Sequence, residues 1–196
     1  AEVRDETGVA EIWTGATARQ LSRVRVTSVV GLEAVAALCD AESADSAEGV
    51  ELEVALGPAT TAWLLEHAAT RLAPLLAAQT LVAQLPNFEY LSEVRDNGSG
   101  PEELARLASV GVRLMNVTRC LGGERVEAGG HFELSRDLLD AAGHMKVTPY
   151  VQRYITGEYY KKSVRCRGCA FDDACKGMHL QFLRAFGFAS LQPIAA

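Results

Sequence analysis

Three cysteines near the C-terminus carry the most specific chemistry in this sequence. Cys166, Cys169 and Cys175 follow the spacing Cys-x2-Cys-x5-Cys, and His179 lies four residues beyond Cys175. A Cys-x2-Cys loop lets two thiolates converge on one inorganic centre while backbone N–H groups turn toward the sulfurs. The spacing therefore predicts a metal site in this part of the chain.

Positive residues lie beside these thiols. Arg165, Arg167 and Lys176 are expected to lower the thiol pKa values and so favour the thiolate form that binds metal. The alternative is that the cysteines are unrelated buried thiols or form disulfides. The acidic chain shows no signal peptide, which predicts a cytoplasmic protein, and closely spaced cysteines in a reducing compartment more often bind metal.

The fourth ligand has two candidates. Cys120 ends an apolar run typical of a strand, at the carboxyl end where α/β folds place their sites. His179 begins a C-terminal helix predicted at residues 179–184. Iron-sulfur clusters are usually held by four thiolates, which favours Cys120, whereas zinc would accept His179 beside three cysteines. The predicted cofactor is a [4Fe-4S] cluster, with zinc as the alternative.

The segment from Cys166 to Gly177, Cys-Arg-Gly-Cys-Ala-Phe-Asp-Asp-Ala-Cys-Lys-Gly, precedes an aromatic helix and the run Phe-Gly-Phe-Ala-Ser-Leu-Gln-Pro-Ile at residues 186–194. This pattern resembles the C-terminal part of radical SAM proteins that carry a SPASM or twitch extension, over residues 110–196. The resemblance implies an auxiliary [4Fe-4S] cluster held by the thiols. The SPASM pattern has a fourth cysteine where this chain has His179, and in a related subgroup an upstream cysteine follows a strand, as Cys120 does.

Radical SAM enzymes hold their catalytic cluster with a Cys-x3-Cys-x2-Cys motif that this sequence lacks. Cys39 is the single cysteine in its N-terminal half. We therefore expect an iron-sulfur accessory protein that is not an independent enzyme and has no site of its own for cleaving S-adenosylmethionine. It would act with a partner in electron transfer or in binding a peptide or protein substrate. The alternative is a non-catalytic interaction module with a structural zinc site.

Composition excludes two other classes of partner. The net charge of −6 and the pI near 5.3 argue against a general nucleic-acid binder, which needs clustered Lys and Arg to neutralise phosphates. The basic stretch at residues 161–167 coincides with the cysteines and is expected to balance the charge of thiolate and sulfide. No apolar run reaches the roughly 18 residues of a membrane-spanning helix.

Segments typical of strands and helices alternate before the cysteine motif. Apolar or β-branched patterns predict strands at residues 24–30, 51–56, 88–94 and 112–118. Helical patterns occur at residues 32–38, 59–72, 75–83 and 101–110. Each helix can supply the crossover that parallel strands require.

This order predicts an α/β fold built as a partial (half) barrel or a small open parallel sheet, with a cysteine-rich metal-binding appendage. A complete eight-unit barrel takes about 250 residues, more than the 196 present. Residues 1–145 are predicted to form the half-barrel-like domain and residues 146–196 the cluster segment. A partial barrel leaves an open edge and apolar surface, which predicts a homodimer or a complex with a partner protein.

Overall fold

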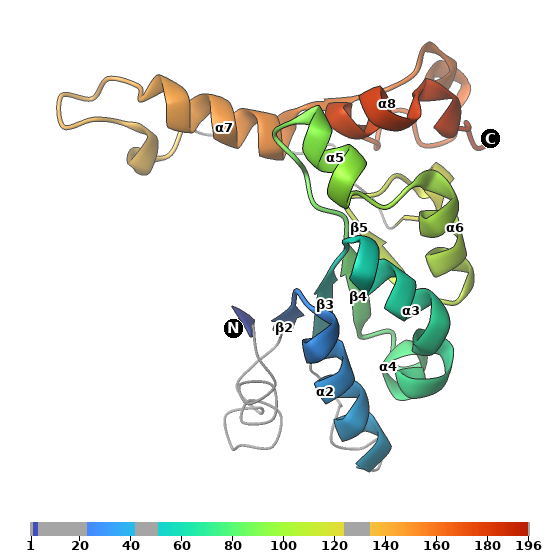
Figure 1. Ribbon diagram of the computed structural model, residues 1–196. Helices are drawn as coiled ribbons and strands as arrows, with labels where there is room; N and C mark the ends of the chain where they lie inside the picture. The colour runs from blue at the N-terminus through green and yellow to red at the C-terminus, as the bar shows by residue number, and fades with distance from the viewer. Residues whose placement is uncertain (1, 4–22, 42–50, 124–133, 196) are drawn as a thin grey trace.

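The computed structural model of this chain describes residues 2–3, 23–41, 51–123 and 134–195. These residues form an α/β layer, shown from blue to green in Figure 1, and a C-terminal segment that crosses one end of it. No helix in the described ranges has the length and apolar character needed to cross a membrane.

A parallel sheet organises the α/β layer. Its strands are β1 (Glu2–Val3), β2 (Arg23–Val26), β3 (Glu51–Ala55), β4 (Leu81–Gln84) and β5 (Arg113–Met115), paired in the order of the sequence. Residues on neighbouring strands align in a row of Val26, Val54, Ala83 and Leu114. The predicted α/β class with a small open parallel sheet is confirmed.

The helices of this layer follow the strands. They are α2 (Val29–Ala41), α3 (Pro58–Arg71), α4 (Ala73–Ala77), α5 (Leu91–Asn97) and α6 (Pro101–Ser109). Right-handed crossovers between strands in sequential order place successive helices on the same face of a sheet. Consistent with this rule, α2 contacts α3 and α3 contacts α6. Figure 1 shows these helices side by side along the strands.

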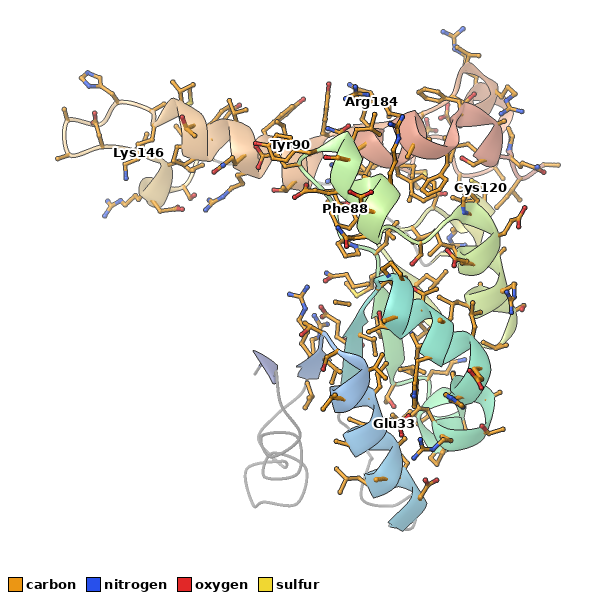
Figure 2. The ribbon with its side chains drawn as sticks, in the orientation of Figure 1. Glu33, Phe88, Tyr90, Cys120, Lys146 and Arg184 are labelled. Carbon is orange, nitrogen blue, oxygen red and sulfur yellow. The ribbon has the colours of Figure 1, made fainter. Side chains whose placement is uncertain are left out.

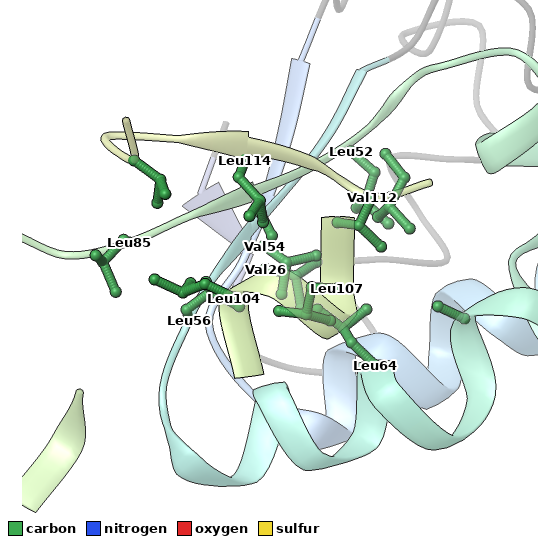
Figure 3. Close-up of a cluster of buried hydrophobic side chains, with 14 of the residues drawn as sticks. Val26, Leu52, Val54, Leu56, Leu64, Leu85, Leu104, Leu107, Val112 and Leu114 are labelled. Carbon is green, nitrogen blue, oxygen red and sulfur yellow. The ribbon is translucent and has the colours of Figure 1, made fainter. Parts of the chain in front are cut away.

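One hydrophobic core joins the sheet to these helices. Val26, Val54 and Leu114 extend from the strands toward Leu64 of α3 and Leu107 of α6, as Figure 3 shows. All five side chains are completely buried. Because side chains alternate along a strand, the residues between these positions face the other side of the sheet.

That other side of the sheet carries charged residues that pair across strands. Arg23 contacts Glu51 at 2.7 Å, and Arg25 contacts Glu53 at 3.3 Å. Arg113 of β5 reaches Glu51 at 3.1 Å. Glu53 is 5% exposed, so its carboxylate depends on these guanidinium groups to offset the cost of leaving water.

The predicted strand at residues 88–94 is wrong, and the predicted helix at residues 75–83 is right only at its start, because α4 ends at Ala77. The third long strand is β4, whereas residues 91–94 begin α5. The helix ends early because Gln79 has a positive φ of 55°. Leu81, Val82 and Ala83 are all buried, so β4 reads as a continuous apolar run, which periodicity cannot distinguish from a helix.

The C-terminal segment begins with a projecting helix and ends beside α5. Its elements are α7 (Val147–Glu158), β6 (Tyr160–Lys161), the 3-10 helix η5 (Val164–Gly168), β7 (Met178–His179) and α8 (Leu180–Phe186). None of the α7 residues is buried, and Figure 1 shows this helix extending away from the rest of the chain. By contrast, α8 packs on α5, and Met178, Phe182 and Leu183 join the main core.

The core prediction concerns Leu64, which no solvent reaches. Leu64→Ala should lower the free energy of unfolding by about 3 kcal/mol, because it removes buried methyl groups and leaves a cavity between α3 and the sheet. Urea unfolding measures this change. The exposed Val30, truncated to Ala, is the control and should change stability by less than about 0.5 kcal/mol. Equal effects of the two truncations would show that the packing in Figure 3 is wrong.

Candidate metal centre

A short antiparallel hairpin closes the cysteine loop. Strands β6 and β7 pair Tyr160 with His179 and Lys161 with Met178, so the two ends of the loop between them meet. Gly177 makes this closure possible, since it has φ +88° and a Cβ there would lie 2.1 Å from the Lys161 carbonyl oxygen. The hairpin therefore holds the whole Cys-x2-Cys-x5-Cys segment as one loop.

Inside this loop the backbone makes consecutive tight turns. The N–H of Cys166 donates to Ser163 O at 3.0 Å, and the N–H of Cys169 donates to Cys166 O at 2.9 Å. The N–H of Asp172 then donates to Cys169 O at 3.0 Å. Because each turn advances three residues, Cys166 and Cys169 return to the same side of the loop.

Cys120 approaches from the α/β layer. It lies on the 3-10 helix η3 (Arg119–Leu121), directly after β5, and its sulfur shares a hydrogen bond of 3.2 Å with the Thr118 hydroxyl. The turn ends at Gly122, whose φ is +82°. A Cβ added at this glycine would lie only 2.5 Å from the Cβ of Ala108. Figure 2 shows Cys120 at the junction between the α/β layer and the C-terminal segment.

All four predicted thiols meet at one cavity. Cys120, Cys166, Cys169 and Cys175 line one partly open space of about 30 Å³. The cavity is completed by Phe171, Leu191 and Ile194, among others. Cys120 is thus brought together with cysteines that follow it by more than forty residues. The structure shows no disulfide at any of the five cysteines, all of which lie in described parts of the chain.

The thiols surround this space and do not converge on a single point. Tetrahedral zinc with four thiolates would bring the sulfurs to within about 4 Å of one another. Within the described ranges, no three Cys, His, Asp or Glu side chains are close enough to hold one metal ion. The cysteines nevertheless influence one another electrostatically, as the pKa of Cys175 shows.

The expectation that nearby cations lower the thiol pKa values is wrong for Cys175. Burial raises the pKa of the Cys175 thiol above its ordinary value. A hydrogen bond of 3.3 Å from the Gly177 N–H and the charge of Lys162 lower the pKa in part, whereas the neighbouring thiols of Cys120 and Cys166 raise it further. Burial among apolar residues thus outweighs the positive charges at this thiol.

His179 lies outside the cysteine cavity. It is 2% exposed, and its Nε2–H donates to the Ile155 carbonyl of α7 at 2.6 Å. The rings of Tyr159 and Tyr160 contact the imidazole edge to face. The structure therefore places Cys120, and not His179, with the other three candidate ligands, while metal binding by any of them stays a prediction.

The chain that follows α8 forms a further wall of the cavity. Residues 191–194 cover the cysteine loop, and the Ala170 N–H donates to Ile194 O at 2.9 Å. Leu191 is 1% exposed and belongs to the main core. The run at residues 186–194 was a sequence signal only as part of the SPASM-like pattern, and nothing in it indicated that these residues line the cavity with the thiols.

The two candidate fourth ligands can be separated by substitution. Cys120→Ala should lower the metal content of the protein several-fold, because it removes one of the four thiols around the cavity. His179→Gln should leave the metal content unchanged, since the amide can still donate to Ile155 O. Elemental analysis per chain measures both. Metal loss in His179→Gln with retention in Cys120→Ala would reverse the assignment.

His179 should also make stability depend on pH. Burial lowers the pKa of His179 below the value of about 6.5 in an unfolded chain, so the folded protein binds fewer protons there. The free energy of unfolding is therefore highest above pH about 6.5, where His179 is neutral in both states. It decreases as the pH falls toward the lowered pKa of the folded state, because protonation then favours the unfolded chain. Thermal melting from pH 8 to pH 5 should show the loss in wild type and a smaller loss in His179→Gln. Identical profiles would contradict it.

Comparison with protein-family models, with curated proteins and with solved structures gives no match to this chain.

Proposed function

We propose that this chain binds a [4Fe-4S] cluster through Cys120, Cys166, Cys169 and Cys175 and serves as an accessory protein related to SPASM-type radical SAM proteins. The observation that supports this proposal best is the shared cavity: four thiols from two segments distant in the sequence border one partly open space. The SPASM-like spacing implies Cys166, Cys169 and Cys175 as ligands, and Cys120 corresponds to the upstream cysteine of the related subgroup.

The arrangement of the thiols favours a cluster over a single zinc ion. A [4Fe-4S] cluster has four irons at separate corners, and each iron takes one thiolate. Its ligands are therefore distributed around a volume, as these four cysteines are around their cavity. Zinc requires all ligands at one centre and commonly accepts histidine, but His179 is bonded to Ile155 O instead.

Residues of this chain would tune such a cluster. The Gly177 N–H already donates to the Cys175 sulfur, and the Thr118 hydroxyl contacts the Cys120 sulfur. Hydrogen bonds to ligating sulfurs raise the reduction potential of iron-sulfur centres. Phe171, Leu191 and Ile194 supply apolar cover that limits water near the cluster. The bound cluster would supply one-electron redox chemistry.

The accessory role follows from the remaining cysteine. Cys39 lies on α2, packs against the core of the α/β layer and has no second cysteine near it in the sequence, so it cannot form the Cys-x3-Cys-x2-Cys motif needed to cleave S-adenosylmethionine. We propose that a partner supplies that chemistry or a peptide or protein substrate, and that the site works in the reducing cytoplasm. The sheet has the sequential strand order of a half barrel. A partner or a second copy would cover its edge strands and its charged face.

Anaerobic purification tests the cofactor directly. The protein should be brown and contain about four irons and four acid-labile sulfides per chain. A colourless protein with one zinc per chain, even after anaerobic reconstitution with iron and sulfide, would overturn the cluster and support a structural zinc module.

Cys169→Ser tests whether cofactor binding and local folding are linked. Binding at a structural site contributes on the order of 10 kcal/mol to folding, so loss of one thiolate should weaken the attachment of residues 163–196 to the α/β layer. Limited proteolysis should then cleave this segment at least tenfold faster than in wild type. Cys39→Ser is the matched control and should retain both the iron and the protease resistance. Equal cleavage of the two variants would refute the link.

A further inference from the structure

The cysteine cavity lies in the most basic part of an acidic chain. Residues 159–178 contain five Lys or Arg and two Asp, a net charge of +3, while the whole chain carries −6. The remaining residues together therefore carry −9. A charge separation of this size steers a charged partner toward one end of a protein and away from the rest.

Two segments contribute cations to this region. Arg119 comes from the end of the α/β layer and Lys162 from the cysteine loop, and both line the cavity with the thiols. Around them the loop adds three more exposed basic side chains. We call these five residues the basic rim: Arg119, Lys161, Lys162, Arg165 and Arg167.

Internal carboxylates neutralise little of the basic rim. Lys162 pairs with Asp172 at 2.8 Å. Arg165 donates to the Phe188 carbonyl at 2.8 Å, and Arg119 lies over the Phe171 ring at 4.6 Å, both of which leave the guanidinium charge uncompensated. Over the ranges that the structure describes, no carboxylate pairs with Lys161 or Arg167. Most of the rim charge is thus available to an arriving partner.

We propose that the basic rim docks an acidic electron-transfer protein at the cysteine cavity, an inference that rests on the cluster of the proposed function. Cys166 and Cys169 are partly exposed between the rim residues, so a partner bound there lies directly over the sulfurs. The cations also balance thiolate charge, but exposed charges act mainly on partners that approach from solvent.

The same charges favour a protein over a nucleic acid. Asp172 and Asp173 lie within the basic region, where they would repel the closely spaced phosphates of a nucleic acid. A folded partner can place its carboxylates beside the cations and away from these two residues. The −9 carried by the rest of the chain repels an extended polyanion. A compact acidic patch on a protein can contact the basic rim without approaching the negative charges of the rest of the chain.

The transfer itself involves one electron. A cluster held by Cys120, Cys166, Cys169 and Cys175 would give up one electron in passing from [4Fe-4S]⁺ to [4Fe-4S]²⁺, and the metal centre of the partner would gain it, for example as Fe³⁺ becomes Fe²⁺. No covalent bond forms or breaks, and no proton is required. The docked complex needs only to bring the two centres close together.

Two acceptors of opposite charge test this docking site. Dithionite-reduced, desalted protein is mixed in a stopped-flow instrument with oxidised rubredoxin, which is small and acidic, or with ferricytochrome c, which is basic. The double variant Lys161→Glu/Arg167→Glu should slow rubredoxin reduction about tenfold and accelerate ferricytochrome c reduction. Arg106→Glu, at an exposed position of α6, is the control and should change neither rate. The rubredoxin rate should fall as ionic strength rises from about 20 to about 200 mM.

The outcomes separate docking from the cofactor. Equal rates for wild type and double variant with rubredoxin, or changes of the same sign with both acceptors, would overturn the docking site. Protein that contains no iron would instead refute the cluster, and calorimetric titration of oxidised rubredoxin into wild type and double variant then tests docking alone. Unchanged rubredoxin affinity in the variant would refute the rim. Tighter binding of a short DNA duplex than of rubredoxin would show that the occupant is a nucleic acid.

Discussion

Burial of apolar side chains from the C-terminal segment holds the two halves of the cysteine cavity together. Met178, Phe182, Leu183 and Leu191 are almost completely buried and share one core with the strands and helices of the α/β layer. This contact fixes the hairpin β6–β7 against the carboxyl end of β5, where Cys120 lies. Because dispersion and hydrophobic burial set most of this placement, the thiols meet without a disulfide between the two segments.

The sheet gives this contact a fixed platform. Its strands follow one another in sequence, so the crossovers place the main helices on one face and leave paired charges on the other. In a doubly wound fold the order of the strands reverses at a switch point. In a barrel each strand lies beside the next one in the sequence, and the order does not reverse. The sequential order here agrees with the predicted half barrel, which nevertheless remains a prediction because five short strands do not define barrel closure.

The sequence predicted the elements with clear local signals. Gly57 and Pro58 marked the start of α3, and Glu51 to Ala55 alternated as a strand with one charged face. The prediction for β4 was wrong because Leu81, Val82 and Ala83 are all buried and show no alternation of polar and apolar residues. The turn before it has a positive φ at Gln79, a conformation that a glutamine does not predict. Local patterns thus failed where burial on both faces removed the alternation.

For the candidate site, spacing was informative only within the loop. Cys166, Cys169 and Cys175 could be grouped from their separation, but the choice between Cys120 and His179 depended on tertiary contacts. The cover by residues 191–194 and the raised pKa of Cys175 also result from burial, which spacing does not encode.

The anchoring of α7 has a mechanical consequence. His179 binds the Ile155 carbonyl, and the Asn87 amide donates to the Thr156 carbonyl at 2.7 Å, so both attachments lie in the last turns of the helix. Because α7 has no buried residue of its own, these attachments beside the hairpin hold its last turns in place. A load on the helix would therefore pass through them to β7, the strand that follows the cysteine loop.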